Sequence, residues 1–513
     1  MAVNEVEPYK LLTPRNRVLA GFALALSNLI VVLDLTIANV SVPHIAGNLG
    51  IAPDQGTWII TSYAVAEAIC VPLAGWLALR FGVVRVFIMS MIGFAIFSLL
   101  CGLSPTLGML VAARIGQGLC GGPLMPMSQT MMLRIFPPQQ RGTAMGLWAM
   151  TTLLGPALGP IIGGSISDNW SWHWIFFINL PIAALCIMIA VALLGPIETK
   201  IEKQRIDRIG LVLLVFWIGC LQIMLDIGRD HDWFADPLIV LLAVLAFVGF
   251  LAFIVWELTE EHPIVDLRVF RHVGFTTGVI SFAFTFGAYF AGIVVIPQWL
   301  QISQGYTATL AGLVTGVTAM AALTVAQIVP KLMTRGVDAR IMVGGAILWL
   351  TGCTIVRAGW TSSMGFEDML WIQFVQGFAM PFFIIPMTTL TLGAVEPRET
   401  ASAAGLQNFL RTMAVAIATS LILTIWGNAQ RVATNDIAGN LNPDETMRSL
   451  EQAGFTAEQG RQMIANVADK EAIAVAVDHV FLVSAVVLFV AFLIVILSPK
   501  PKPLAGGPPT GGH

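Results

Sequence analysis

The chain alternates between long apolar segments and short polar connections. A helix that crosses about 30 Å of hydrocarbon needs about 20 mostly apolar residues, and fourteen segments of the sequence meet this requirement. We predict spans at residues 17–37, 57–78, 84–104, 107–133, 141–166, 174–195, 209–228, 237–258, 275–299, 307–330, 339–360, 367–392, 401–427 and 475–497. The pattern therefore predicts an all-α polytopic membrane protein.

Most of the 27 Lys and Arg residues lie in alternate connections between these spans. Basic residues collect in the cytoplasmic connections of membrane proteins, so the pattern places both termini in the cytoplasm. Arg229, Arg357 and the basic residues of the long connection 428–474 are assigned to the outer side. Arg114 and Arg411 fall within spans, where a charge costs about 2.5–3.5 kcal/mol even on the insertion scale. We expect each of these two to face a cavity or a partner.

Composition narrows the function classes. Charged residues make up 11% of the chain and apolar residues 57%, with a net charge of -3. An ordinary soluble domain has about 25% charged and 45–50% apolar residues, which excludes a water-soluble enzyme of ordinary type. The chain has no general basic field for nucleic acid and carries no nucleotide signature. We predict no nucleic-acid partner, no cofactor and no metal site.

Short motifs recur in the two halves of the chain. Leu77, Arg80, Gly82 and Arg85 after the second span are matched by Leu332, Arg335, Gly336 and Arg340 after the tenth. Gln117-Gly118 in the fourth span is matched by Gln376-Gly377 in the twelfth, and the two offsets are 255 and 259 residues. Spans 1–6 would then correspond to spans 9–14, with two extra helices between them. Two homologous bundles around a central path are a common plan for transporters.

This repeat predicts four regions. An N-terminal six-helix bundle covers 1–196, and a linker at 197–273 holds the two inserted transmembrane helices, at about 209–228 and 237–258. A C-terminal six-helix bundle covers 274–498 and includes the outer loop 428–474. Residues 499–513 form a cytoplasmic tail.

Five motifs in the first half match those of a known family. They lie at 33–43, 75–85, 114–118, 155–164 and 174–181. On these residues the chain resembles the major facilitator superfamily, and within it the fourteen-span drug:proton antiporters of the EmrB-like multidrug efflux type. The resemblance implies a major facilitator fold of two six-helix bundles plus two extra transmembrane helices. Leu79 stands where the family usually has an Asp, so the charge-relay role of that Asp is not expected here.

The resemblance also implies a function. The chain would export hydrophobic or amphipathic toxic compounds across a bacterial inner membrane, driven by protons and by alternating access. It would work in a tripartite pump with a periplasmic adaptor protein and an outer-membrane channel, and the outer loop 428–474 is either a contact for the adaptor or a plain connector. The alternative is a proton-coupled symporter that imports a small nutrient. An enzyme is not expected, because the long loop has no nucleophile or metal constellation.

Three ionisable residues within spans are candidates for proton coupling. The depths of Asp34 and Arg114 along their helices place them near each other in the outer half of the N-terminal bundle. We predict Asp34 as the main proton carrier and Arg114 as its modulator, because a guanidinium nearby changes how readily a carboxylate binds a proton. Glu67 would be a second carboxylate or a contact for cationic substrates. The structural alternatives are a helix-end hydrogen bond of Asp34 and an inert interhelical contact of Glu67.

The candidate substrate contacts are polar, aromatic and methionine side chains within spans: Glu67, Gln129, Arg411, Tyr289 and Met127. Flexible Met and aromatic walls suit compounds of different shapes, although such stripes also face lipid or neighbouring helices. Arg411 would contact an anionic substrate or form a cytoplasmic-gate pair, or else extend to the cytoplasmic interface.

Two glycine motifs are candidates for conformational roles. The first is an antiporter hinge, implied by the resemblance, made of Gly155, Pro156, Gly159, Pro160, Gly163 and Gly164. Small residues four apart also allow static close packing of helices, and the two roles do not exclude each other. The second, also implied by the resemblance, is a cytoplasmic gating loop with Gly75, Arg80, Gly82 and Arg85.

Overall fold

The computed structural model is helical wherever it is described. It describes residues 8–51, 53–56, 58–201, 205–229, 231–396, 398–440, 450, 452 and 455–497, and these form α-helices and short 3-10 turns without a strand. Eleven helices in this part of the chain are long and apolar enough to cross a membrane, or twelve if one bent pair counts as a single span. The predicted all-α membrane fold is confirmed.

In the first half of the chain, two helices begin at threonine caps, and two predicted spans are interrupted at prolines. The side chain of Thr13 accepts the N–H of Asn16 at the start of α1, and Thr106 caps α6 in the same way. Pro72 and Pro123 lie at the breaks that divide predicted spans 2 and 4 into two helices each, because proline removes a helical N–H. The helices are α1 Pro14–Leu49, α2 Pro53–Gly56, α3 Trp58–Cys70, α4 Ala74–Phe81, α5 Val83–Gly102, α6 Leu107–Gly121, α7 Leu124–Ile135, α8 Arg141–Asn169, α9 Trp174–Phe177 and α10 Asn179–Leu193, with the 3-10 turns η1 Pro8–Leu11, η2 Pro138–Gln140 and η3 Gly195–Ile197.

The second half follows two further helices that stand between the halves in sequence. These two, α11 Arg208–Ile227 and α12 Pro237–Thr259, pack against each other. The helix α11 also contacts α3 of the first half and α19 of the second. The remaining elements are η4 Trp233–Ala235, η5 Leu267–Arg271, α13 Val273–Ile302, α14 Ala308–Val325, α15 Ile328–Thr334, α16 Ala339–Arg357, α17 Phe366–Gly377, α18 Ala379–Gly393, α19 Thr400–Asn440 and α21 Ala457–Leu497.

A helical segment lies at each of the fourteen predicted spans. The bent pair is α3 and α4, which meet at 57°. Two predicted spans do not meet the criteria of length and hydropathy: one is divided between α6 and α7, and the other is α8. Fourteen membrane crossings therefore remain a prediction.

The internal repeat is visible in the backbone. A Cβ on Gly118 would overlap the carbonyl oxygen of Tyr63, and a Cβ on Gly377 would overlap that of Thr318. Tyr63 and Thr318 are separated by the offset of 255 that the sequence motifs share. Gly82 and Gly336 also take the same left-handed backbone, with φ of 90° and 86°, which favours glycine. The two halves thus use the same close helix contacts at matching positions.

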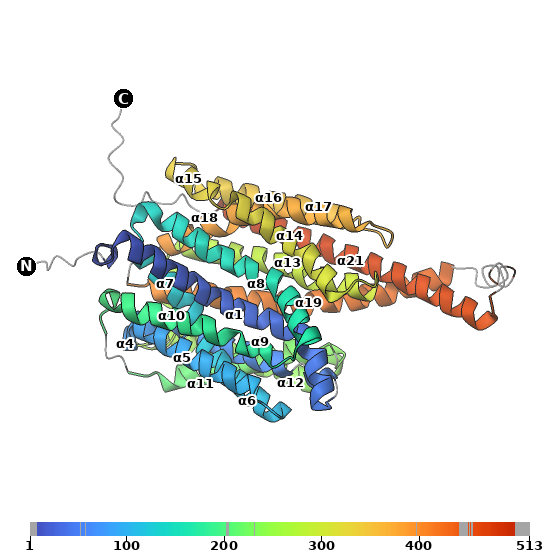
Figure 1. The fold of residues 1–513 in the computed structure, drawn as a ribbon, viewed down its shortest axis with the longest axis horizontal. Coiled ribbons are helices and arrows are strands. Elements are labelled where there is room, and N and C mark those ends of the chain that lie inside the picture. The colour runs from blue at the N-terminus through green and yellow to red at the C-terminus, as the bar shows by residue number, and fades with distance from the viewer. Residues whose placement is uncertain are drawn as a thin grey trace, which may run out of the picture.

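The outer segment 428–474, predicted as a loop, contains the ends of two long helices. The helices α19 and α21 have 41 residues each, which at 1.5 Å per residue makes each about 60 Å long, twice the hydrocarbon thickness. Their adjoining ends project together beyond the other helices in Figure 1, and Gln430 donates to Asp469 across them at 3.0 Å. The sequences at 444–453 and 457–467 are both compatible with a helix; 457–467 lies within α21, whereas most of 444–453 lies outside the described residues. We call 428–440 and 457–474 the helical arm.

The start of α1 and the end of α21 lie at one end of the bundle, opposite the helical arm (Figure 1). We call this the inner end. The two halves of the chain contact each other there, because Gly75 of α4 packs against Ser402 of α19. Gly146 of α8 also packs against Ile385 of α18. One apolar cluster containing Met127, Trp148, Phe286 and Phe383 spans both halves.

Candidate functional site

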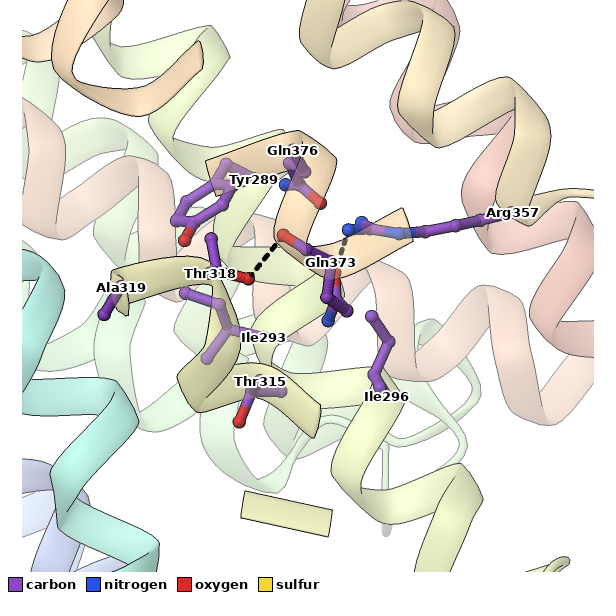
Figure 2. A pocket seen from close by; sticks show the side chains of 10 residues that line it. Tyr289, Ile293, Ile296, Thr315, Thr318, Ala319, Arg357, Gln373 and Gln376 are labelled. Atoms are coloured by element: carbon purple, nitrogen blue, oxygen red, sulfur yellow. Dashed lines mark hydrogen bonds between the residues drawn. The ribbon is translucent and has the colours of Figure 1, made fainter. Parts of the chain in front are cut away.

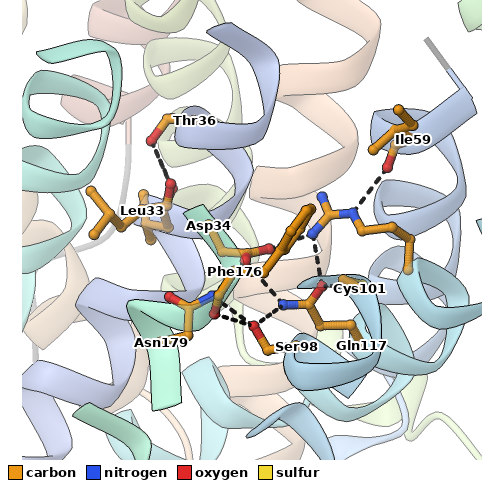
Figure 3. A network of polar contacts seen from close by, with 11 residues as sticks. Leu33, Asp34, Thr36, Ile59, Ser98, Cys101, Gln117, Phe176 and Asn179 are labelled. Atoms are coloured by element: carbon orange, nitrogen blue, oxygen red, sulfur yellow. Dashed lines mark hydrogen bonds and ion pairs between the residues drawn. The ribbon is translucent and has the colours of Figure 1, made fainter. Parts of the chain in front are cut away.

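The predicted pairing of Asp34 with Arg114 is confirmed. Arg114 Nη1 donates to Asp34 Oδ2 at 2.5 Å, and both side chains are buried, with 0% and 1% of their surface exposed. Asp34 Oδ1 also accepts from Gln117 Nε2 at 2.9 Å and from Asn179 Nδ2 at 2.7 Å. Ser98 accepts from the same two amides (Figure 3). The carboxylate on α1 is therefore joined to α5, α6 and α10 by a closed polar network.

Arg114 also holds α3 in this network. Its Nε donates to the carbonyl oxygen of Ile59 at 3.0 Å, and its guanidinium lies 4.2 Å from the centre of the Tyr63 ring. A buried guanidinium needs such partners, because burial of an unpaired charge costs several kcal/mol. Separation of Arg114 from Asp34 would therefore loosen contacts among three helices at once.

Glu67, Gln129 and Arg411 lie where the two halves meet. Glu67 of α3 is 3% exposed, and its charge lies close enough to that of Arg411 on α19 to interact with it. Gln129 Oε1 of α7 accepts from Asn408 Nδ2 of α19 at 2.7 Å. These contacts cross from the first half to the second, so relative movement of the halves must break or exchange them.

Arg411 does not extend to the membrane interface. It is 6% exposed, its guanidinium lies 5.3 Å from the centre of the Phe286 ring, and Nη2 donates to Met125 Sδ at 2.7 Å. The interfacial alternative for this residue is wrong, because its charge is directed into the seam between the halves. Met127 is fully buried beside Met125. On α13, Phe286 is 5% exposed and faces Arg411, whereas Phe284 is 45% exposed.

A fifth buried charge, Arg357, was missed in the sequence. Arg357 was assigned to a connection on the outer side, but it is the last residue of α16 and is 3% exposed, so it does not lie in a solvent-exposed connection. It donates through Nη2 to Gln373 Oε1 of α17 (Figure 2). The signal was present, because Arg357 falls inside the predicted span 339–360 and Gln373 is the repeat position of Arg114.

Arg357 lines a small cavity of the second half. A second cavity adjoins it and shares Tyr289, Gly292, Arg357 and Gln376 in its wall. The predicted substrate contact Tyr289 thus lines both cavities. The two hollows lie between α13, α14, α16, α17 and α21, and the walls are lined by Ala288, Tyr289, Gly292, Ile293, Ile296, Thr315, Thr318, Ala319, Leu350, Thr354, Arg357, Gln373, Gln376, Phe481, Ser484 and Leu488.

Three further ionisable residues lie within predicted spans and were not among the candidates. Asp226 lies in α11, Glu257 in α12 and Asp478 in α21. Glu257 is fully buried and accepts the backbone N–H of Val265 at 3.1 Å, which fastens the loop after α12. Glu257 therefore has a structural role. No group of three or more His, Cys, Asp or Glu residues suited to a metal ion occurs in the described part of the chain.

The glycine run of α8 packs directly on α1. A Cβ on Gly155 would lie 2.8 Å from Val32 Cβ, one on Gly159 would lie 2.6 Å from Thr36 Cβ, and one on Gly163 would lie 3.1 Å from the carbonyl oxygen of Ile37. Thr36 Oγ1 also donates to the carbonyl oxygen of Gly155 at 3.1 Å.

Two of the contacted residues, Val32 and Thr36, lie two positions before and after Asp34 in α1, so this close contact adjoins the ion pair. Gly164 points to open space, with nothing within 4 Å of an added Cβ. The structure does not describe the side chains of Pro156 and Pro160.

The predicted gating loop at Gly75, Arg80, Gly82 and Arg85 contains a carboxylate contact that was not expected. Glu198, which follows α10, accepts the backbone N–H groups of Val84 and Arg85 at 3.0 Å each. A Cβ on Gly82 would touch this carboxylate. The start of α5 thus receives a negative charge at its N-terminus, which stabilises a helix, although Leu79 offers none.

We expect Glu198→Ala to lower stability by about 1 kcal/mol, because it removes the N-terminal cap of α5. A thermal melt of the purified protein in detergent would measure this as a lower transition temperature. The matched control is Glu261→Ala, which removes an exposed carboxylate from the loop after α12. Equal melting of the two variants would contradict the capping role.

These features define a membrane transporter rather than an enzyme: two related helical halves meet along a seam that carries buried charges. The model of the Major Facilitator Superfamily matches residues 24–419, which is most of the chain. The chain therefore belongs to the major facilitator superfamily.

Relatives of known name cover nearly the whole chain. Over 502 residues it is 42% identical to the multidrug export protein EmrB of Escherichia coli (strain K12), covering 97% of this chain and 98% of that protein. It is 38% identical to the fatty acid resistance protein FarB of Neisseria gonorrhoeae, covering 96% and 97%. The crystal structure of human MFSD10 has the same fold, with a TM-score of 0.57 at 14% identity over 93% of this chain and all of that one.

Proposed function

We propose that this protein exports hydrophobic and amphipathic compounds in exchange for protons. The buried pair of Asp34 and Arg114 is the observation that carries the proposal. A charge pair of this kind at membrane depth is costly and marks proton or ion pathways in transporters. Relatives named for multidrug export and for fatty acid resistance support apolar and amphipathic substrates.

In this proposal Asp34 binds the transported proton and Arg114 regulates its binding. While the guanidinium contacts the carboxylate, a proton must compete with a positive charge at 2.5 Å. A shift of α6 relative to α1 would separate the pair and let Asp34 take up a proton. Each inward positive charge gains about 2.3 kcal/mol per 100 mV of membrane potential, which is the driving force for export.

The substrate would occupy the seam between the halves. Glu67 and Arg411 offer one charge of each sign there, and Gln129, Met127 and Tyr289 offer polar and apolar contacts. The charge of Arg411 would balance that of Glu67 until a cationic or anionic substrate displaces one of them. The α1–α8 contact at Gly155, Gly159 and Gly163 would act as the hinge whose tight packing closes the path.

The proposed setting is a bacterial inner membrane, with both termini in the cytoplasm and the helical arm on the opposite face. The arm extends past the membrane-spanning part of the bundle (Figure 1). It would contact a periplasmic adaptor protein, which would join the transporter to an outer-membrane channel. A proton-coupled importer of small nutrients is the alternative function.

A screen in cells that lack their own efflux pumps tests the direction of transport. We expect expression of this chain to lower the accumulation of hydrophobic cations, amphipathic acids and uncharged drugs several-fold, and a protonophore to abolish the difference. Cells carrying Gly159→Leu provide the inactive control, because a large side chain cannot fit against Thr36. Increased uptake of a nutrient, with no change for any drug, would favour the alternative.

A further inference from the structure

Three arginines are buried in the described part of the chain, and they differ in their counter-charges. Arg114 has Asp34 at 2.5 Å, and Arg411 lies within the electrostatic reach of Glu67. No ion pair of Arg357 is found among the described residues; the titratable side chains close to it are Cys353 and Tyr289, which are ordinarily uncharged near neutral pH. Arg357 is thus the buried guanidinium that the chain does not neutralise with a carboxylate of its own.

The internal repeat shows why this arginine lacks a partner. Gln373 and Gln376 stand at the positions of Arg114 and Gln117 in the first half, and Arg357 stands at that of Ser98. The second half therefore repeats the polar network but moves its positive charge from the fourth helix of the bundle to the third. The position of Asp34 falls on Tyr289 at the offset of 255 and on Ile293 at 259, so the repeat supplies no carboxylate.

Gln373 does not satisfy all the donors of the Arg357 guanidinium. Its Nη2 donates to Gln373, while the buried Nε has no hydrogen-bond partner in the described chain. Gly292 leaves space over the group, since an added Cβ would lie at ordinary contact distance, 3.5 Å, from Nη1. Figure 2 shows the guanidinium of Arg357 extending toward Gln373, with Gln376 and Tyr289 beyond it. A guanidinium whose donors are not all used can make a charge-assisted hydrogen bond to a carboxylate.

Apolar side chains complete the walls of the two cavities. Ile293, Ile296, Phe481 and Leu488 surround the polar end at Arg357. The rings of Tyr289 and Phe286 lie 6.4 Å apart, and Phe286 is the ring beneath Arg411 in the seam. An aromatic path thus joins the cavity to the proposed substrate site. A ligand that fits these walls has an apolar body and a negatively charged head.

We propose that the cavity at Arg357 binds the anionic head group of amphipathic acids, with Arg357 as the charged contact and Gln376 as a polar one. This inference rests on the proposed function for the transport that follows binding. Arg357 would make the protein selective for acids over uncharged compounds of the same shape. The role of Arg357 at the end of α16 is then recognition as well as packing against Trp360 and Phe481.

The test measures binding of laurate and of its uncharged counterpart dodecanol to the full-length protein in phosphatidylcholine nanodiscs, by titration calorimetry. We expect wild type to prefer laurate at least about tenfold, because charge-assisted hydrogen bonds are worth more than neutral ones. In Arg357→Gln the ratio of the two affinities should fall to about one. Arg461→Gln, which removes an exposed arginine of the helical arm, is the matched control and should keep the wild-type ratio.

Two further variants keep the test decisive if Arg357→Gln does not fold. Gly292→Leu fills the cavity and leaves the arginine in place, and Ile293→Asp offers it an internal carboxylate. Each should lower laurate affinity about tenfold or more. Gly292→Leu should weaken both ligands, whereas Arg357→Gln and Ile293→Asp should weaken laurate more than dodecanol. In either of the last two variants, an unchanged ratio of the two affinities would overturn the proposal, since an equal loss for both ligands indicates a structural role.

Changes of the medium distinguish laurate from other anions that Arg357 could bind. The titrations are repeated with gluconate in place of chloride and with phosphatidylglycerol in the nanodiscs. The assignment to a substrate would be overturned if laurate binding did not depend on Arg357 while the binding of chloride or phosphatidylglycerol did. If laurate binds through Arg357 but no compound is exported in cells, the binding site stands and the proposed function fails.

Discussion

Asp34→Asn is expected to abolish proton exchange while substrate binding remains. An amide cannot take up a proton near neutral pH, yet its oxygen still accepts a hydrogen bond from Arg114 and it keeps the size of Asp34. Loss of the counter-charge should also lower stability. Removal of one partner from a buried ion pair costs about 3–5 kcal/mol, and the loss here should be smaller. In proteoliposomes, we expect no proton movement when substrate is added.

Substrate counterflow distinguishes this loss from misfolding. Exchange of labelled for unlabelled substrate needs the binding site and the conformational change but no net proton transfer. We expect Asp34→Asn to retain counterflow at a rate within about tenfold of wild type. The control is Asp226→Asn, which neutralises a carboxylate of α11 that accepts a hydrogen bond from Gln222 and is not part of the Asp34 network. Proton exchange that persists in Asp34→Asn would remove this residue from the coupling mechanism.

Gly159→Ala is expected to block the close contact of α8 with α1. The added methyl group would lie 2.6 Å from Thr36 Cβ and 3.1 Å from its carbonyl carbon, so the two helices must separate. Overpacking of this kind costs about 1–3 kcal/mol, which changes a conformational equilibrium about five- to hundredfold. Export should fall by a similar factor, and the melting temperature of the purified protein should fall with it.

Gly164→Ala is the matched control in the same helix. Nothing lies within 4 Å of its added Cβ, and alanine favours a helix over glycine by about 1 kcal/mol. We expect unchanged or slightly higher stability and normal export. If Gly159→Ala behaves like Gly164→Ala, the helix contact has no part in the transport cycle.

The arrangement of helices and the ion pair could be predicted from the sequence. Fourteen apolar segments predicted the helices, and the shared offset of the motifs predicted the repeat that Gly118 and Gly377 now display in space. Asp34 and Arg114 could be paired because a membrane offers few ways to neutralise a charge, so two opposite charges at similar depth are strong partners.

Arg357 and Glu198 could not be placed in this way. A basic residue at the end of a span reads as a connecting charge, and only tertiary packing of α16 against α17 and α21 buries Arg357. Glu198 is far in sequence from Val84, and nothing in the local pattern directs its carboxylate to the start of α5. The length of the helical arm was also missed, because α19 continues past Gly427 into polar residues and α21 begins in polar residues before its apolar span.

The coupling of export to protons is tested most directly by the lumenal pH of proteoliposomes that contain the wild-type protein. The lumen is made acidic, and an uncharged compound exported in the cellular screen is added outside. The mechanism predicts that the compound enters as protons leave, so the lumenal pH rises when the compound is added and does not rise in Asp34→Asn. Entry of the compound with no change in pH, or with further acidification of the lumen, would contradict proton antiport.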